Sequence, residues 1–312
     1  MSEKTSTPTR TLIDRLPGPG TGIDLYRIAL YVMIFFFVAF FLTPIMVGLI
    51  TSFKTDQAVT ATLPFLPPSS SGFTLNNWSI AFDALARGFI NSLLMSVPAT
   101  ILCVLFGSMA AYGITLLSWR GQIPILVLFL IGIFIPYQAV LVPLSRFWAI
   151  YLPLKDLLTP LYALPFIQPA DAQLVQLMIT HVGYGIPICT LLFRSYYQSL
   201  PGDLVEAAQI DGASITSIYR RIVLPLSTPM IGVVLIYQFT QIWNEFLFAL
   251  TIVTSSSSPA APITLILSGL GTSLSGTDFG VRMAGAFLAA LPTLVIYVLF
   301  AEQFAQGLET GG

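Results

Sequence analysis

The chain has 312 residues, of which 55% are hydrophobic and only 9% are charged, and its net charge is −1. Soluble domains carry roughly 25% charged residues, so this composition excludes a soluble protein with a fully solvated surface. The net charge also argues against a nucleic-acid partner held by a basic surface. The high share of apolar residues and the low share of charged ones indicate that most of the surface faces a lipid bilayer.

Long charge-free runs occur along the whole chain, and crossing the hydrocarbon as a helix takes about 20 apolar residues. Six such runs are present, the last broken only by Arg282 at its start: 28–53, 88–119, 121–145, 172–193, 222–244 and 281–301. A seventh run at 157–170 is short and interrupted by three prolines, so a membrane-surface or re-entrant segment is expected there. The sequence predicts an all-α integral membrane protein with six transmembrane helices.

The basic residues predict how these helices are oriented. With six spans, the N-terminus, the loops at 118–122 and 195–221, and the C-terminus share one side. That side holds eight Lys and Arg residues and the other side five, and the richer side is normally cytoplasmic. Residues 1–24 are then a cytoplasmic tail, 25–308 the six-helix membrane domain and 309–312 a cytoplasmic end.

No catalytic or metal site is visible in the sequence. Cys103 and Cys189 both fall inside apolar runs, where they are expected to pack as small hydrophobes rather than form a disulfide. His181 is the sole histidine, and we expect it to be a packed or pore-edge polar residue. The phosphate-binding pattern G-x-x-x-x-G-K-[ST] is absent, so any nucleotide must bind another chain.

The polar loop at 199–225 carries the most specific pattern. Ser199 is expected to cap a short helix, Gly212 to allow a sharp turn at positive φ, and Ser214 to cap a second helix. The loop is predicted to form two short helices at an angle. The residues of its pattern, EAA-x3-G-x9-I-x-LP, are Glu206, Ala207, Ala208, Gly212, Ile222, Leu224 and Pro225, with Asp211 directly before the glycine.

This spacing resembles the cytoplasmic coupling loop of membrane subunits in ATP-binding cassette (ABC) importers. From about residue 25 to the end, the chain is similar to carbohydrate-type importer permeases, of the kind represented by the smaller membrane subunit of the maltose transporter. Asn91-Ser92, the GIP at 185–187 and WNEFLFAL at 243–250 add to the resemblance.

The resemblance implies the type I importer permease fold and a set of partners. These are a second permease subunit, expected to be a different but related chain, two ABC ATPase subunits that hold ATP and Mg, and an extracytoplasmic sugar-binding protein. The chain itself is then a transport subunit, not an enzyme, and binds no cofactor. A bacterial inner membrane with both termini cytoplasmic is expected. Glu206 would help hold the loop in a cleft of the ATPase, and Gly212 would make its turn.

Two further groups of residues are candidates for contacts outside the loop. The resemblance implies that the segment 254–280 can reach into the binding protein, with Thr272, Ser273, Leu274, Ser275 and Gly276 as candidates. Polar and aromatic residues also gather near the end of the fifth span, where they suit a sugar pathway but equally suit helix–helix hydrogen bonds. They are Tyr237, Gln238, Gln241, Trp243, Asn244 and Glu245.

An alternative from another class is a self-sufficient secondary transporter or channel. Such a protein favours an intramembrane carboxylate for ion coupling, and Glu245 is the clear candidate. Ion-driven uptake by this polypeptide alone would separate the two hypotheses.

Overall fold

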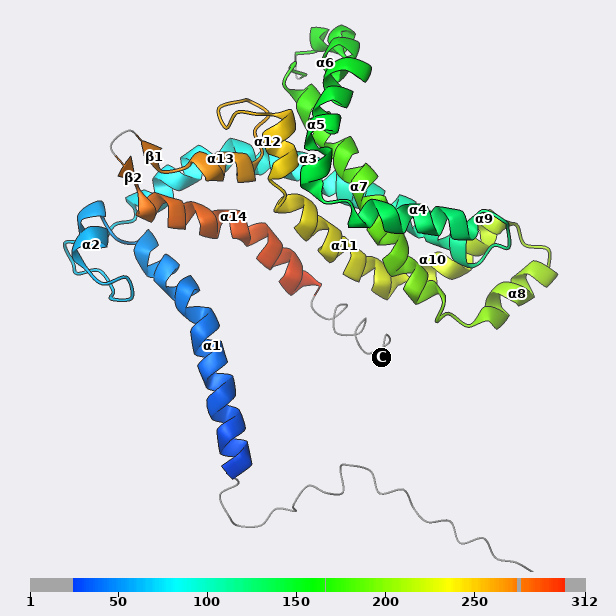
Figure 1. Ribbon diagram of the computed structural model, residues 1–312, viewed down its shortest axis with the longest axis horizontal. Helices are drawn as coiled ribbons and strands as arrows, with labels where there is room; N and C mark the ends of the chain where they lie inside the picture. Colours follow the sequence, from blue (N-terminus) through cyan, green and yellow to red (C-terminus); the bar gives the residue numbers. More distant parts are fainter. Residues whose placement is uncertain (1–24, 166, 274–275, 301–312) are drawn as a thin grey trace, which may run out of the picture. The chain divides into compact units, whose positions relative to one another are not determined.

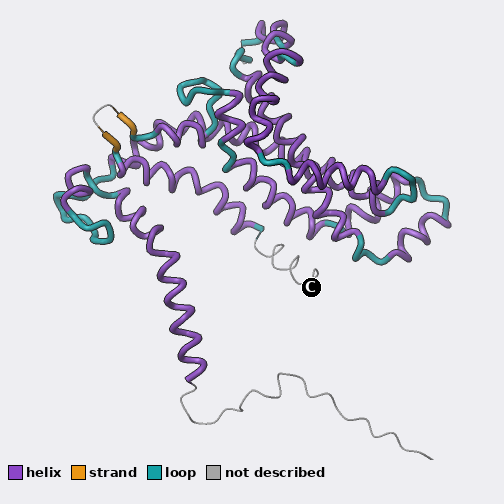
Figure 2. The backbone as a smooth tube through the Cα atoms, in the orientation of Figure 1, coloured by secondary structure: helices purple, strands orange, loops and turns teal. Residues whose placement is uncertain are grey.

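The computed structural model describes residues 25–300 apart from 166, 274 and 275, and this part is almost entirely helical (Figures 1 and 2). By its internal contacts the chain divides into two compact units, Met1–Gly48 and Leu49–Gly312. The predicted tails at 1–24 and 309–312 lie outside the described residues. The packing described below is that of the second unit.

Four described helices are long and apolar enough to cross a membrane: α1 (Leu25–Ser52), α3 (Asn76–Thr115), α7 (Asp171–Tyr197) and α14 (Phe279–Leu299). Two bent helix pairs also qualify, which makes up to six spans in the described part of the chain if each pair is one span. One pair is α4 (Gln122–Phe134) with Tyr137–Ala163, bent by 99°, and the other is Ile215–Leu226 with α11 (Thr228–Trp243), bent by 77°. The predicted all-α membrane fold is confirmed; the third span is strongly bent, and the chain also bends sharply where Ile215–Leu226 leads into α11.

The bend of the third span follows from a proline. Pro136 disfavours helical backbone at the residue before it, and Ile135 is extended at φ −73° and ψ 116°. The chain then restarts as α5 (Tyr137–Arg146), continues as the π-helical turn η2 (Phe147–Tyr151), and passes into α6 (Leu154–Leu157) and the 3-10 turn η3 (Thr159–Ala163). Within 154–165 no described helix is long enough to span.

Helix α3 begins before the predicted apolar run at 88–119. Residues 77–85 belong to the first turns of the same 40-residue helix. No proline or unfavourable turn separates them from the apolar run, and Trp78 packs on Phe53 and Phe287 at ring distances of 5.5 and 6.3 Å. Aromatic packing therefore keeps these turns in line with the span.

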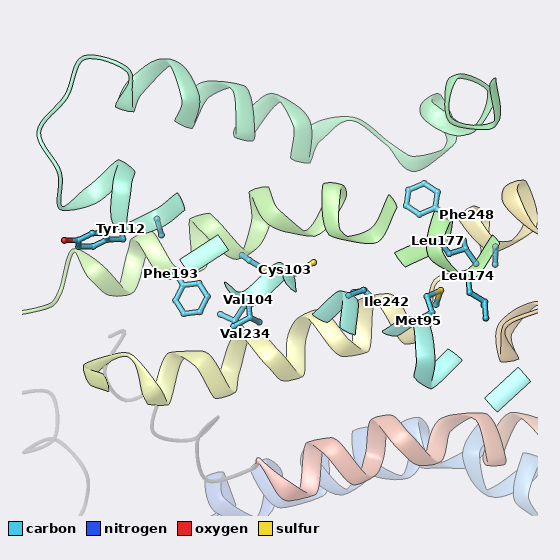
Figure 3. Packing of buried hydrophobic residues seen from close by; sticks show 14 of the residues in the cluster. Met95, Cys103, Val104, Tyr112, Leu174, Leu177, Phe193, Val234, Ile242 and Phe248 are labelled. Carbon is cyan, nitrogen blue, oxygen red and sulfur yellow. The ribbon is translucent and has the colours of Figure 1, made fainter. Parts of the chain in front are cut away.

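The core lies along α3, α7 and α11 (Figure 3). Gly107 of α3 allows a very close crossing, because a Cβ there would lie 2.5 Å from the Cβ of Cys189 in α7. Cys103 lies at the same crossing, and both cysteines are buried and free. Their predicted role as small packed side chains is confirmed.

The Asn91-Ser92 pair fastens α3 to the segment before α13 (Ile263–Gly269). The Asn91 amide donates to the carbonyls of Pro259 and Ala261 at 2.8 and 3.0 Å. The Ser92 hydroxyl accepts from the Ile263 backbone N–H at 2.8 Å. Both side chains are buried, so the pair satisfies backbone groups that would otherwise be unpaired in an apolar setting.

Outside the polar loop, the remaining described elements are short. They are α2 (Asp56–Ala61), α12 (Leu247–Ile252) and a hairpin of β1 (Thr272–Ser273) and β2 (Gly276–Thr277). The two strands are antiparallel, with Thr272 opposite Thr277 and Ser273 opposite Gly276. The hairpin immediately precedes α14 (Figure 1).

Candidate functional site

The polar loop folds as two short helices with a sharp turn between them, as the spacing predicted. Helix α8 (Gly202–Ile210) ends at Asp211, and Gly212 then adopts φ +78°, a region that L side chains rarely enter. Helix α9 (Ile215–Ile218) follows and passes through the π-helical turn η4 (Tyr219–Val223) into α10 (Leu224–Leu226). We call residues 201–226 the coupling segment.

One predicted cap is present and one is absent. The Ser214 hydroxyl accepts from the Ser217 backbone N–H at 3.2 Å and caps α9. Ser199 does not cap α8, because Pro201 holds the N-cap position and the Ser199 hydroxyl donates to the Tyr196 carbonyl instead. The serine thus closes the end of α7.

The motif residues divide between surface and core. Glu206, Ala207, Asp211 and Gly212 are exposed and Ala208 is half-buried. Ile222 and Leu224 pack against the core, and Pro225 is exposed. Two isoleucines beside the turn are also exposed to solvent, Ile210 by 80% and Ile215 by 57%.

Hydroxyl groups join the coupling segment to two long helices. The Ser108 hydroxyl of α3 lies 2.6 Å from the Tyr197 hydroxyl of α7 and 2.9 Å from that of Tyr219 in η4. Tyr112 donates to the Ile215 carbonyl at 3.1 Å, and Tyr196 donates to the Leu226 carbonyl at 2.9 Å. These residues could not be picked out from the sequence, since tyrosine in an apolar run carries no signal of its own.

The polar residues of the fifth span do not form one group. Tyr237, Gln238, Gln241 and Glu245 line a recess of about 30 Å³. Its other walls come from residues that sequence reasoning did not connect with the span: Tyr137 of α5, and His181, Tyr184, Gly185 and Ile188 of α7.

Trp243 and Asn244 lie elsewhere. Trp243 is 1% exposed and donates through Nε1 to the Ala289 carbonyl at 2.9 Å, which places it in the packing between α11 and α14. Asn244 donates to the Thr240 carbonyl and lines a separate cavity of about 530 Å³ whose wall includes Arg282 of α14.

Glu245 lies just after α11 and forms hydrogen bonds with both α12 and α13. Both of its carboxylate oxygens accept from the Phe248 backbone N–H, at 2.9 and 3.0 Å, and so cap α12. Its carbonyl accepts from the Thr264 hydroxyl of α13 at 2.9 Å. The carboxylate therefore has a fixed position, with Oε2 3.9 Å from His181 Nε2.

The hairpin before α14 carries the residues proposed to reach a binding protein. Thr272 is exposed and its hydroxyl donates to the Gly269 carbonyl at 2.6 Å, while Gly271 adopts φ +69°. Ser273 and Gly276 face each other across the strand pair. Leu274 and Ser275 lie outside the described residues.

Two acidic side chains meet beside this hairpin. Asp278 caps α14 by accepting from the Val281 N–H, and Asp56 begins α2. Desolvation raises the pKa of the Asp56 carboxyl, and the neighbouring Asp278 charge raises that pKa further. Within residues 25–300, apart from the three not described, no three His, Cys, Asp or Glu side chains are grouped to hold a metal ion.

The arrangement defines a class: a multi-pass helical membrane protein with two short angled helices inserted before the fifth span. The fold matches a chain of a bacterial ABC transporter involved in the import of the acidic polysaccharide alginate. The TM-score is 0.63 at 16% identity, over 95% of this chain and 99% of that one.

The chain belongs to the family of inner membrane components of binding-protein-dependent transport systems, which matches residues 89–308. It is 60% identical over 289 residues to the xylose/arabinose import permease protein XacI of Haloferax volcanii, covering 92% of this chain and 94% of the relative. It is 29% identical to the arabinooligosaccharides transport system permease protein AraQ of Bacillus subtilis, covering 93% and 96%. The family makes this chain a transport permease subunit, as the resemblance implied, and not an enzyme.

Proposed function

We propose that this chain is the membrane-spanning permease subunit of an ABC importer that takes up a sugar by alternating access. The observation that carries the proposal is the coupling segment, in which the Gly212 turn joins two short helices and leaves Glu206, Ala207 and Asp211 exposed. The relatives support a sugar as solute, since their names include import of xylose, arabinose and arabinooligosaccharides.

The coupling segment is the proposed contact with an ATPase subunit. Glu206, Ala207, Ala208, Asp211 and Gly212 form its outer part, and Ile222, Leu224 and Pro225 return the chain to the span. The small alanine side chains give α8 a narrow profile, and Ile210 and Ile215 offer apolar area that an ATPase cleft would bury. ATP and Mg belong to that partner, and this chain binds no cofactor.

The complete transporter contains further chains in this proposal. They are a second permease subunit, expected to be a related but different chain, two ATPase subunits and an extracytoplasmic sugar-binding protein. The hairpin residues Thr272, Ser273, Leu274, Ser275 and Gly276 are the proposed contact with the binding protein. Both termini and the coupling segment are then cytoplasmic, in agreement with the excess of basic residues on that side.

Glu206→Ala in the assembled transporter tests the coupling assignment. In the described part of the chain, Glu206 is exposed and its side chain makes no hydrogen bond or ion pair, so its removal leaves the fold undisturbed. We expect sugar uptake into vesicles to fall at least tenfold and copurification of the ATPase to weaken. Asp83→Ala is the matched control, because it removes an exposed carboxylate from α3, and it should change neither quantity.

Two results would contradict the proposal. Uptake by Glu206→Ala at the level of the control would exclude the coupling role. Uptake by this polypeptide alone, driven by an ion gradient and without any ATPase, would favour the secondary transporter based on Glu245.

A further inference from the structure

We propose that this chain contacts the transported solute directly, through the recess between α5, α7 and α11, and that the recess receives one hydroxyl group of a sugar. The inference rests on the proposed function and adds a specificity-determining site to it. The recess is defined by Tyr137, His181, Tyr184, Tyr237, Gln241 and Glu245.

An unpaired polar atom points to a missing ligand. His181 is 4% exposed, and its Nε2 has no hydrogen-bond partner within the described part of the chain. Glu245 Oε2 lies 3.9 Å from this nitrogen, too far for a hydrogen bond. Buried polar groups in native proteins are nearly always paired, so an oxygen from outside the chain, placed to one side of these two atoms and within hydrogen-bond reach of both, would satisfy them.

The size of the recess limits that group. Its volume is about 30 Å³, and a cavity needs roughly 10–15 Å³ on this measure to hold one water. One hydroxyl or one water fits, and a whole sugar ring does not. A hydroxyl can accept a hydrogen bond from a ring N–H while donating its own proton to a carboxylate oxygen, so it can pair with both His181 and Glu245.

The rim offers surfaces for the rest of a sugar. Tyr137 and Tyr237 are 40% and 38% exposed, and Gln241 is exposed beside them. Aromatic faces suit the C–H face of a sugar ring, and an amide can both donate to and accept from its other hydroxyls. The ring would then lie on the exposed tyrosines while one hydroxyl enters the recess.

The inner walls are held in place by packing. Tyr137 contacts Phe248 and Tyr184 at ring distances of 5.1 and 5.2 Å, and His181 contacts Phe248 at 5.5 Å. Glu245 is fixed by its bonds to the Phe248 N–H. Such preorganisation lets a site distinguish a hydroxyl from a hydrogen, because loss of the hydroxyl leaves fixed polar groups unpaired.

The test uses the complete transporter without its binding protein, so that the specificity of the binding protein does not mask that of the permease. Equilibrium dialysis with radiolabelled D-xylose and L-arabinose measures binding to the detergent-purified complex at millimolar concentrations. We expect His181→Phe to weaken binding of the better-bound sugar at least tenfold. Glu245→Gln retains an oxygen for the Phe248 N–H and should weaken binding by a similar factor. Thr43→Val, which removes a hydroxyl from α1, should bind as the wild type does.

A set of singly deoxygenated analogues of the bound sugar identifies the hydroxyl. The wild type should discriminate against one analogue at least tenfold, and His181→Phe should lose this discrimination while still copurifying with the ATPase. Equal binding by wild type and both recess variants would overturn the inference, as would water alone in the recess of a sugar-bound complex. These results leave the coupling assignment intact, since that assignment is judged by the uptake and ATPase copurification of Glu206→Ala.

Discussion

The hydroxyl of Tyr219 lies 2.9 Å from the hydroxyl oxygen of Ser108. Tyr219 belongs to the coupling segment and Ser108 to α3, and the Ser108 hydroxyl also bonds to Tyr197 of α7 at 2.6 Å. One buried serine oxygen is therefore shared by three elements. Since an unpaired hydroxyl is costly in this setting, the three elements are expected to move together when the coupling segment is displaced.

Tyr219→Phe should uncouple ATP hydrolysis from transport. The variant keeps the ring packed on Tyr112 at 5.2 Å but loses the bond to Ser108, at a cost of about 1 kcal/mol in the free energy of unfolding. We expect the amount of sugar transported per ATP hydrolysed to fall several-fold in proteoliposomes. Tyr162→Phe, which removes an exposed hydroxyl bonded to the Lys155 carbonyl, is the control. An unchanged ratio in Tyr219→Phe would exclude a coupling role for this bond.

Gly212→Ala should impair uptake through backbone strain alone. A Cβ at Gly212 meets nothing within 4 Å, but φ is +78°, and left-handed backbone costs an L residue roughly 1–2 kcal/mol. The angle between α8 and α9 should relax, and uptake should fall. Gly202→Ala also has free space and no left-handed φ, so it should transport normally. Equal uptake by the two variants would show that the turn is not needed.

Gly185→Ala should destabilise the crossing of α3, α7 and α11. The added Cβ would lie 2.3 Å from Gln238 Nε2 and 2.5 Å from Cys103 Sγ, and overpacking of this kind costs about 1–3 kcal/mol. The melting temperature of the complex in detergent should fall by several degrees. Gly183→Ala meets nothing within 4 Å and should melt with the wild type. Identical melting of both variants would contradict this close packing.

Asp56→Asn should stabilise the protein in a pH-dependent manner. The pKa of Asp56 is raised in the folded state by desolvation and by Asp278, so the ionised carboxylate opposes folding above that raised pKa. The gain of the variant should therefore be present at neutral pH and vanish as the pH falls below the unfolded-state value of about 3.9.

The size of this gain is limited by solvent, because Asp56 is exposed. Screening keeps it below about 1 kcal/mol and should reduce its electrostatic part further in 1 M salt. Melting curves at pH 7 and pH 4 measure the difference. A variant that is less stable than the wild type at neutral pH would contradict the unfavourable pairing of the two aspartates.

The sequence predicted the spans and the coupling segment because both leave local signals. Apolar runs of membrane length need no knowledge of their neighbours, and the Gly212 turn and the Ser214 cap depend on residues within a few positions. The bend at Pro136 was harder to predict, since prolines inside spans are often tolerated. The start of α3 at Asn76 lies before the apolar run, where Trp78 packs on Phe53, a residue distant in the sequence.

The recess and the hydroxyl cluster could not be predicted because their members are far apart in the sequence. Ser108 is 89 residues from Tyr197 and 111 from Tyr219, and helical periodicity does not relate such positions. Trp243 and Asn244 show that residues close together in the sequence can also lie in different places in the structure. They adjoin recess residues in the sequence, yet one is buried against α14 and the other lines a different cavity.

The hydrogen bonds by which Asn91 and Ser92 hold the segment before α13 affect how movement is transmitted along α3. These residues hold the start of α13, and Ser108 holds the coupling segment 16 positions further along the same helix, about 24 Å away at ~1.5 Å per residue. Helix α3 is thus attached to α13 through Ser92 and to the coupling segment through Ser108, with Pro98 between these two residues. A displacement of Tyr219 would therefore be transmitted along α3 to Ile263, at the start of α13, without passing through loops.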